Sequence, residues 1–321
     1  MFLVTGATGF IGKNLLPTIS DIKRIRILVR KTSNIEPFKH LKNIEIVYGN
    51  LENSEGLEEA MDNVDIVIHC AARTTGRNFI EYYRTNASGT AHVLKAMKMK
   101  AVQKILYLSS HAVCGPSRKD TSFSEMDEPK PISFYGATKK IAEDYIAESG
   151  VQYIILRPVA VYGPYDMDIL KYIKLINQGF CPIIGYGEKF IKLIYIADLV
   201  GLIIRIIETN NFDNQIYFAS DGNSYHMQEV LTEIAHILNK KVYKIHVPEK
   251  IALLIGLLND IFIPQPKKLV CRDKIKELAK NAWLCCDDKL KAEYNFTPLY
   301  DLKKGMKETI NWYYENGLLK S

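Results

Sequence analysis

The first residues of the chain constrain its fold more than any other segment. Phe2-Leu3-Val4 is a short β-type run, Thr5-Gly6-Ala7-Thr8-Gly9-Phe10-Ile11-Gly12 is a glycine-rich turn, and a helical pattern of apolar residues follows. Glycine permits positive φ angles and close backbone approach, and a helix N-terminus offers free N–H groups to a pyrophosphate. The spacing Gly-x-x-Gly-x-x-Gly between a strand and a helix therefore predicts a dinucleotide-binding turn.

Strand and helix patterns alternate through the first half of the chain. The further expected strands are 25–29, 44–48, 64–69, 105–110 and 153–156, and helical patterns cover 57–61 and a segment that begins near Asn86. This alternation predicts an α/β fold with a Rossmann-type, doubly wound parallel sheet. Ligands bind beyond the carboxyl ends of such strands. We therefore expect one crevice to collect the residues at those ends, namely Gly6, Arg30, Ala71, Ser110 and Arg157.

The regular alternation ends after Tyr162-Gly163-Pro164. Helical stretches at 169–176, 196–207, 227–238, 251–258 and 274–280 are mixed with short β runs at 190–195, 215–219 and 242–246. We predict an NAD(P)-binding domain over 1–162, to which 190–220 returns. A smaller, discontinuous C-terminal lobe of residues 163–189 and 221–321 is expected to bind the substrate.

Net charge, cysteine spacing and the pattern of apolar residues argue against several classes of protein. The net charge of +6 is spread along the chain, so a nucleic-acid partner is not expected. The six cysteines lack Cys-x-x-Cys or zinc-finger spacing, which predicts reduced thiols and no metal site. The N-terminus shows no signal-peptide pattern, and the longest apolar run, 251–263, is too short to span a bilayer. We expect a cytoplasmic protein.

Tyr135 and Lys139 lie four residues apart on a predicted helix, so their side chains share one face. A nearby cation lowers the pKa of a phenol, which predicts that Tyr135 exchanges a proton with a substrate hydroxyl. Tyr300 and Lys304 have the same spacing. However, Tyr135 alone follows a strand-end serine, Ser110, by 25 residues, so only the first pair can form a Ser-Tyr-Lys site.

Arg30 follows the second expected strand and bears on the choice of cofactor. NAD-selective sites place an acidic residue there to bind the ribose 2′-OH, whereas an arginine suits a 2′-phosphate. Arg30-Lys31 therefore favours NADP over NAD, although two basic residues can also simply begin a solvated loop.

Taken together, these segments resemble the extended short-chain dehydrogenase/reductase family, the NAD(P)-dependent epimerase/dehydratase type. The resemblance covers the whole chain. It rests on the glycine-rich turn and on six further segments, namely His69-Cys70-Ala71-Ala72, Asn86 with Gly89-Thr90, Leu108 to Gly115, Tyr135 to Lys139, Leu156-Arg157-Pro158 and Tyr195-Ile196-Ala197-Asp198.

The resemblance implies a role for each matching residue. Tyr135 would be the general acid/base, Lys139 would hold the nicotinamide ribose and lower the Tyr135 pKa, and Ser110 would bind the reacting oxygen. The implied cofactor-binding residues are Gly6, Thr8, Gly9, Phe10, Ile11, Gly12, Arg30, Asn50, Leu51, Cys70, Ala71, Ala72, Asn86, Tyr135, Lys139, Arg157, Pro158 and Val159. The sequence departs from the family at Asn50, where an Asp is usual near the adenine, and at Cys114, where a Tyr is usual.

The sequence specifies the reaction and the substrate less closely than it specifies the family. A 4,6-dehydratase usually carries Thr-Asp-Glu where this chain has Ser110-His111-Ala112, so reduction or epimerisation is favoured. The expected substrate is a nucleotide-sugar bound by Ser110, His111, Lys192 and Arg272. The alternative is a hydrophobic hydroxy or keto compound, because Val247 to Leu258 and Cys271 to Lys274 resemble the 3β-hydroxysteroid dehydrogenase-like branch, in which an apolar helix lines the pocket.

Two further expectations concern partners and catalysis. Family members commonly form a homodimer through the helix after Gly89 and the helix that bears Tyr135, and Ile141, Ala142, Tyr145 and Ile146 supply apolar surface for it or for an intrachain core. A non-catalytic NAD(P)-sensing protein is the alternative of another class. It predicts a damaged Ser-Tyr-Lys set, which this chain does not show.

Overall fold

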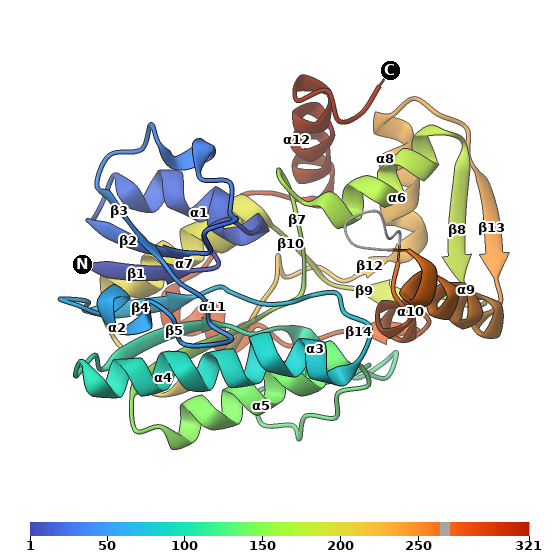
Figure 1. The fold of residues 1–321 in the computed structure, drawn as a ribbon. Helices are drawn as coiled ribbons and strands as arrows, with labels where there is room; N and C mark the ends of the chain where they lie inside the picture. Colours follow the sequence, from blue (N-terminus) through green and yellow to red (C-terminus); the bar gives the residue numbers. More distant parts are fainter. Residues whose placement is uncertain (264–269, 321) are drawn as a thin grey trace.

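The computed structural model describes residues 1–263 and 270–320, and a seven-stranded sheet forms its main body (Figure 1). All neighbouring strands run parallel, in the order β11-β6-β5-β4-β1-β2-β3. The strands are β1 (Phe2–Thr5), β2 (Ile25–Val29), β3 (Ile44–Tyr48), β4 (Ile66–His69), β5 (Lys104–Leu108), β6 (Gln152–Pro158) and β11 (Gln215–Ala219). The predicted Rossmann-type sheet is confirmed. Strand order reverses between β1 and β4, which is where such sheets bind ligands.

Both faces of the sheet are covered, as the apolar strands require. Along β1, Val4 belongs to the core cluster on one face and Leu3 to the cluster on the other. Helices α1 (Phe10–Ser20) and α7 (Ile196–Thr209) pack on the first face, and α2 (Leu57–Ala60), α4 (Gly89–Met99) and α5 (Phe134–Glu148) pack on the second. The sheet therefore holds α5, with Tyr135 at its start, in a fixed position.

The helix expected near Asn86 begins earlier in the structure. Helix α3 (Phe79–Tyr83) is capped by Asn78, whose side chain accepts a hydrogen bond from the backbone N of Glu81 at 3.1 Å. A π turn, η2 (Arg84–Ser88), then joins α3 to α4. The sequence pattern gave no sign of the π turn, which widens the helix where Asn86 must reach neighbouring elements.

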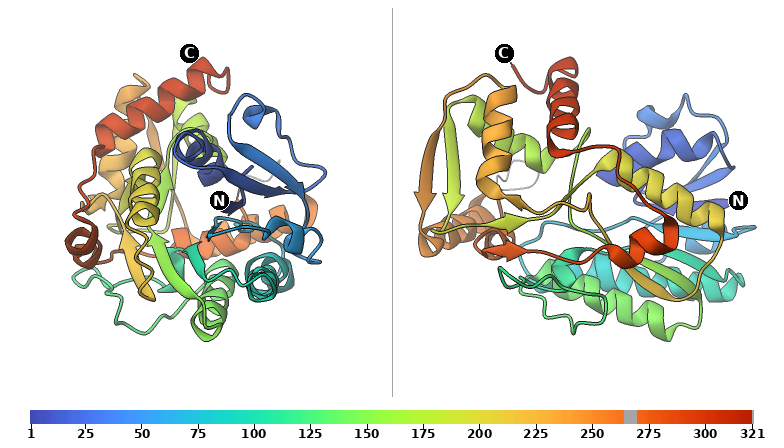
Figure 2. Two further views of the ribbon diagram at one scale, coloured as in Figure 1. Left: turned by 90° about the vertical axis from the view of Figure 1, so that its left-hand side faces the viewer. Right: turned by 180° about the vertical axis from the view of Figure 1, so that it is seen from behind.

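The remaining elements gather mainly at the end of the molecule opposite the N-terminus (Figure 2). Those at this end are α6 (Met167–Asn177), α8 (Met227–Ile237), α9 (Glu249–Phe262), α10 (Arg272–Leu278) and the parallel pair β8 (Phe180–Ile184) and β13 (Tyr243–Val247). Two helices near the C-terminus complete the fold, α11 (Asp288–Tyr294) beside β11 and α12 (Leu302–Glu315) beside α8. Two 3₁₀ turns are η1 (Glu36–Phe38) and η3 (His111–Val113).

The single β run expected over 190–195 is split into two strands. Strand β9 (Phe190–Ile191) joins β12 (Tyr225–His226) and β14 (Ala282–Trp283), whereas β10 (Leu193–Tyr195) pairs with β7 (Ala160–Tyr162). Lys192 lies between them, and its buried ammonium is 3.5 Å from the Asp287 carboxylate. The chain therefore passes from one sheet to the other at Lys192, whose side chain points into the protein toward Asp287.

Within the described ranges 1–263 and 270–320, the structure contains no helix that combines the length and the apolar character needed to cross a membrane.

Candidate active site

The glycine-rich turn lies at the point where strand order reverses. Gly6 has a φ of +74°, and a Cβ atom at this position would lie 2.5 Å from the backbone nitrogen of Ala71. The turn after β1 is thus pressed against the loop after β4, and only glycine allows this approach. Helix α1 starts directly after Gly9, with no side-chain cap and no acidic residue in its first turn. Its first N–H groups fit an anionic pyrophosphate.

The other residues expected around the adenosine half of a dinucleotide follow β2 and β3. Arg30 is exposed just after β2, while its neighbour Lys31 is paired with Glu55 at 2.9 Å. Asn50 folds back on its own loop, because its side-chain oxygen accepts a hydrogen bond from the backbone N of Glu52 at 3.0 Å. Of the two basic residues, Lys31 is therefore held by a partner within the protein.

Asn86 has a structural role that the sequence did not specify. Its side-chain oxygen accepts from the backbone N of Arg73 at 2.7 Å, and its amide donates to the Arg73 carbonyl and to Thr138 Oγ1, each at 3.1 Å. Asn86 is 1% exposed, so these protein groups surround it. It ties the loop that contains Cys70, Ala71 and Ala72 to the helix that bears Tyr135.

Tyr135 meets Ser110 across the start of α5. Ser133 caps this helix by accepting a hydrogen bond from the backbone N of Gly136 at 3.0 Å. A Cβ atom on Gly136 would lie 2.3 Å from the Ala112 carbonyl oxygen, so the first turn of α5 packs directly on η3. This packing brings Tyr135 near Ser110, whose side chain acts to lower the Tyr135 pKa.

The expected effect of Lys139 on Tyr135 is wrong for this structure. Burial, reinforced by the negative charge of Glu277, raises the pKa of Tyr135 to about 12, and the cation that opposes this rise is Lys274. Lys139 is fully buried, donates to the Leu108 carbonyl and lies 4.0 Å from the centre of the Tyr107 ring. Burial lowers the pKa of Lys139 to about 7. At neutral pH Tyr135 is therefore a protonated phenol, ready to donate.

Arg157, a predicted cofactor-binding residue, lies inside the protein with a different partner. Its guanidinium makes two hydrogen bonds to the Glu143 carboxylate, at 3.0 and 2.6 Å, and both side chains are almost fully buried. Ser109 donates to the same carboxylate. Glu143 is one helical turn beyond Lys139, so this network anchors the face of α5 that bears Lys139 to β5 and β6. Pro158 and Val159 are buried at the end of β6.

The residues predicted to bind substrate are not gathered in one place. His111 is 4% exposed and is surrounded by the rings of Phe123, Phe218 and Trp283. Burial lowers the pKa of His111 to about 3, so it is neutral. Lys192 is buried beside Asp287, whereas Arg272 is exposed at the first position of α10.

The apolar helix that the alternative substrate would need does not wall a closed pocket. Ile251, Leu254 and Leu258 on α9 are each about half exposed. A pocket walled by these three residues, which would have favoured the hydrophobic substrate, is therefore not seen in the described part of the chain.

Helix α10 contributes residues to the site that sequence reasoning missed. The Asp273 carboxylate accepts hydrogen bonds from the backbone N of Phe134 at 2.8 Å and of Tyr135 at 3.1 Å. Glu277 accepts from Ser133 Oγ at 2.6 Å and pairs with Lys274 at 2.8 Å. Two carboxylates from α10 thus complete the N-terminus of α5, where a helix favours negative charge.

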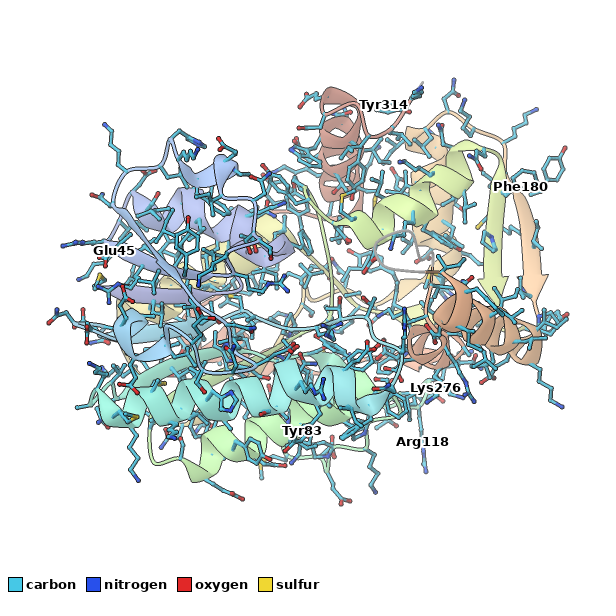
Figure 3. The ribbon with its side chains drawn as sticks, in the orientation of Figure 1. Glu45, Tyr83, Arg118, Phe180, Lys276 and Tyr314 are labelled. Carbon is cyan, nitrogen blue, oxygen red and sulfur yellow. The ribbon has the colours of Figure 1, made fainter. Side chains whose placement is uncertain are left out.

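Two lysines hold α10 against these neighbours. Lys276, labelled in Figure 3, places its ammonium 4.6 Å from the centre of the Phe134 ring. At the other end of α10, the Lys189 ammonium donates to the carbonyls of Leu278, Ala279 and Lys280 at 2.9–3.0 Å. Lys189 therefore caps the C-terminus of α10.

Comparison with known proteins agrees with this geometry. The model of the NAD dependent epimerase/dehydratase family matches residues 2–219, which include the glycine-rich turn, Ser110, Tyr135 and Lys139. The chain belongs to this family. The match ends at Ala219, the last residue of β11, so the family model covers every strand of the main sheet.

Individual family members resemble the chain over most of its length. The UDP-glucose 4-epimerase of Vibrio cholerae is 28% identical over 77% of this chain and 78% of its own length. The N-acetyl-alpha-D-glucosaminyl-diphospho-ditrans,octacis-undecaprenol 4-epimerase of Escherichia coli O157:H7 is 26% identical over 97% of this chain and 94% of its own. The structure of MoeE5 in complex with UDP-glucuronic acid and NAD superimposes with a TM-score of 0.79 at 22% identity, covering 98% and 99% of the two chains. The fold of the whole chain is thus that of this enzyme family.

Proposed function

We propose that the protein is an NAD(P)-dependent oxidoreductase of the epimerase/reductase type that acts on a secondary alcohol or ketone of a sugar joined to a diphosphate, most often a nucleotide-sugar. The closeness of Ser110 and Tyr135, together with a glycine-rich turn in the same sheet, carries this proposal. The two named relatives support the substrate class, because each acts on a sugar carried by a diphosphate.

The site's own residues account for the proton chemistry. When bound, the nicotinamide supplies the hydride acceptor or donor. Ser110 holds the reacting oxygen, and Tyr135 gives its proton to that oxygen in the direction of reduction or takes it in the direction of oxidation. The raised pKa of Tyr135 favours the donor form in the free protein. Lys139, whose charge acts on the Cys70 thiol, would hold the nicotinamide ribose.

The C-terminal elements are the proposed substrate lobe. We assign Arg272 and Lys274, at the start of α10, to binding the diphosphate. Both side chains are exposed, and the charge of Lys274 acts on Tyr135. Lys192 is excluded from this role by its burial beside Asp287. NADP remains the proposed cofactor over NAD, because of Arg30.

Turnover of a panel of UDP-sugars tests the proposal, with products separated by chromatography and NADPH and NADH absorbance followed. We expect Tyr135→Phe and Ser110→Ala to lower kcat by a factor of about 10² to 10⁴. Tyr300→Phe is the matched control, because Tyr300 has the same spacing to Lys304, whose ammonium lies 4.0 Å from its ring, outside the site. Equal activity in the Tyr135→Phe and wild-type proteins would remove Tyr135 from the mechanism. Cofactor binding without turnover of any substrate would instead favour a sensing role.

A further inference from the structure

Helix α9 exposes its apolar side chains to solvent instead of burying them. Seven of its large apolar residues are between 38% and 74% exposed, namely Ile251, Leu254, Ile255, Leu257, Leu258, Ile261 and Phe262. The buried residues of the helix are Ala252, Gly256 and Asp260. An ordinary surface helix has the opposite pattern, with apolar residues inside and polar residues outside.

The exposed residues of α9 form one continuous face. Their spacing of three and four residues, from Ile251 through Leu254 and Leu258 to Ile261, places them over about half of the helix circumference. The buried residues, four apart, form the opposite line. On that side α9 packs against α10, and the backbone N of Arg272 donates to the Asp260 carboxylate at 3.0 Å. The apolar face therefore points away from the body of the protein.

The neighbouring pair of strands extends this surface. Residues paired in register share one face of a parallel sheet, and one face of β8–β13 carries the pairs Phe180–Tyr243, Pro182–Ile245 and Ile184–Val247. Phe180, Tyr243 and Ile245 are 44–76% exposed. Strand β13 leads directly into α9, and both lie at the end of the molecule opposite the N-terminus (Figure 1). Phe180 is labelled at this end in Figure 3. We call α9 and this sheet face together the α9–β13 surface.

Exposed lysines accompany the apolar residues. Lys240 and Lys241, just before β13, and Lys250, in the first turn of α9, are exposed. The carboxylates within residues 239–262 are Glu249, which lies 3.5 Å from Lys280, and Asp260, which is buried against α10. The charge that this segment presents to solvent is therefore positive.

We propose that the α9–β13 surface binds the face of a lipid bilayer that carries anionic headgroups. Apolar side chains of one helix face with lysines beside them suit the boundary between acyl chains and headgroups. A second copy of the chain fits less well, because a symmetric contact would bring the same lysines together, and Glu249 in this segment is already paired with Lys280. This inference goes beyond the proposed function and does not depend on it.

Membrane contact would place the bilayer close to the candidate site. Helix α10 separates the two, since it packs on α9 through Arg272 and Asp260 and on the start of α5 through Asp273. A substrate with a long lipid tail, held at Tyr135, would then have acyl surface one helix away.

Vesicle co-sedimentation tests the inference, with the full-length protein and without nucleotide or substrate. Vesicles of phosphatidylcholine alone are compared with vesicles that also contain phosphatidylglycerol. We expect binding to the anionic vesicles, about a hundredfold weaker after the triple change Lys240→Gln, Lys241→Gln and Lys250→Gln. Leu254→Gln with Leu258→Gln should weaken binding by a similar factor.

Matched controls change equally exposed residues elsewhere. Lys95→Gln, Lys98→Gln and Lys303→Gln control for net charge, and Met126→Gln with Leu299→Gln control for apolar exposure. Equal losses in variants and controls would overturn the inference, as would failure of the wild-type protein to bind anionic vesicles. The inference would also be overturned if light scattering showed that the wild-type protein is a dimer, that the Leu254 and Leu258 changes convert it to a monomer, and that neither form binds vesicles. Tyr135→Phe should bind vesicles like the wild type, so failure of the proposed function is separately visible.

Discussion

The contact between α10 and α5 predicts the effect of replacing Asp273 with Asn. The carboxylate is 5% exposed and accepts hydrogen bonds from two successive N–H groups, those of Phe134 and Tyr135. Asn has a similar shape but offers one neutral acceptor oxygen instead of two charged ones. The variant therefore loses one charge-assisted hydrogen bond and the favourable charge at a helix N-terminus.

The size of the effect follows from these two losses. A hydrogen bond to a charged group contributes about 1.5–3 kcal/mol, part of which the neutral amide retains, and the helix dipole adds about 0.3–1 kcal/mol. We expect Asp273→Asn to lower the free energy of unfolding by about 2 kcal/mol and the Tm by about 4 °C. Because one lost bond belongs to the backbone of Tyr135, we also expect kcat to fall by a factor of about 10 to 100.

Thermal unfolding and steady-state kinetics with a UDP-sugar measure the two effects. Asp301→Asn is the matched control, since Asp301 caps α12 by accepting from the backbone N of Lys304 at 2.7 Å, away from Tyr135. The control should lose stability but keep its kcat. If both variants lose kcat equally, or if Asp273→Asn loses only stability, α10 does not position Tyr135 and the reasoning is wrong.

Three more predictions concern charged residues. Lys139 has a folded pKa of about 7 against 10.5 when unfolded, so the unfolded chain binds more protons between these values and this group makes stability rise with pH in that window. Lys139→Met should abolish activity and remove up to about 1.4 kcal/mol per pH unit of that rise in stability. A difference in Tm between the wild type and the variant that stays constant from pH 7 to pH 9 would contradict this. Lys274 lowers the Tyr135 pKa, so Lys274→Gln should move the alkaline limb of the pH–rate profile upward and raise KM for UDP-sugars about tenfold, and an unchanged profile would exclude the contact. Arg30→Asp should shift preference from NADPH to NADH in a fluorescence titration, and unchanged relative affinities would count against the role of Arg30.

Most of the main sheet was predictable, because buried parallel strands are short apolar runs that end at glycines or polar residues. Gly6, Ala71 and Ser110 were placed at one edge by this rule alone, and the structure brings Gly6 against Ala71. The rule fails for Arg157, which also stands at a strand end but turns inward to Glu143. Strand position fixes the backbone of such a residue, whereas its side chain follows the nearest buried charge.

The contribution of α10 was beyond sequence reasoning. Asp273 and Glu277 reach Phe134 and Ser133 across sequence separations of 139 and 144 residues, and no periodicity connects such segments. The same holds for the electrostatics of Tyr135. The spacing to Lys139 predicted a lowered pKa, but burial and Glu277 raise the pKa and the opposing cation is Lys274, and all of these effects depend on tertiary packing.

The distant origin of the α5 cap also bears on how the protein is made. Ribosomes release the glycine-rich turn, Ser110 and Tyr135 long before they reach Asp273, so a nascent chain has its nucleotide-binding half while the first turn of α5 still lacks its anion. Competence for turnover should therefore arise late in synthesis, when α10 emerges and docks.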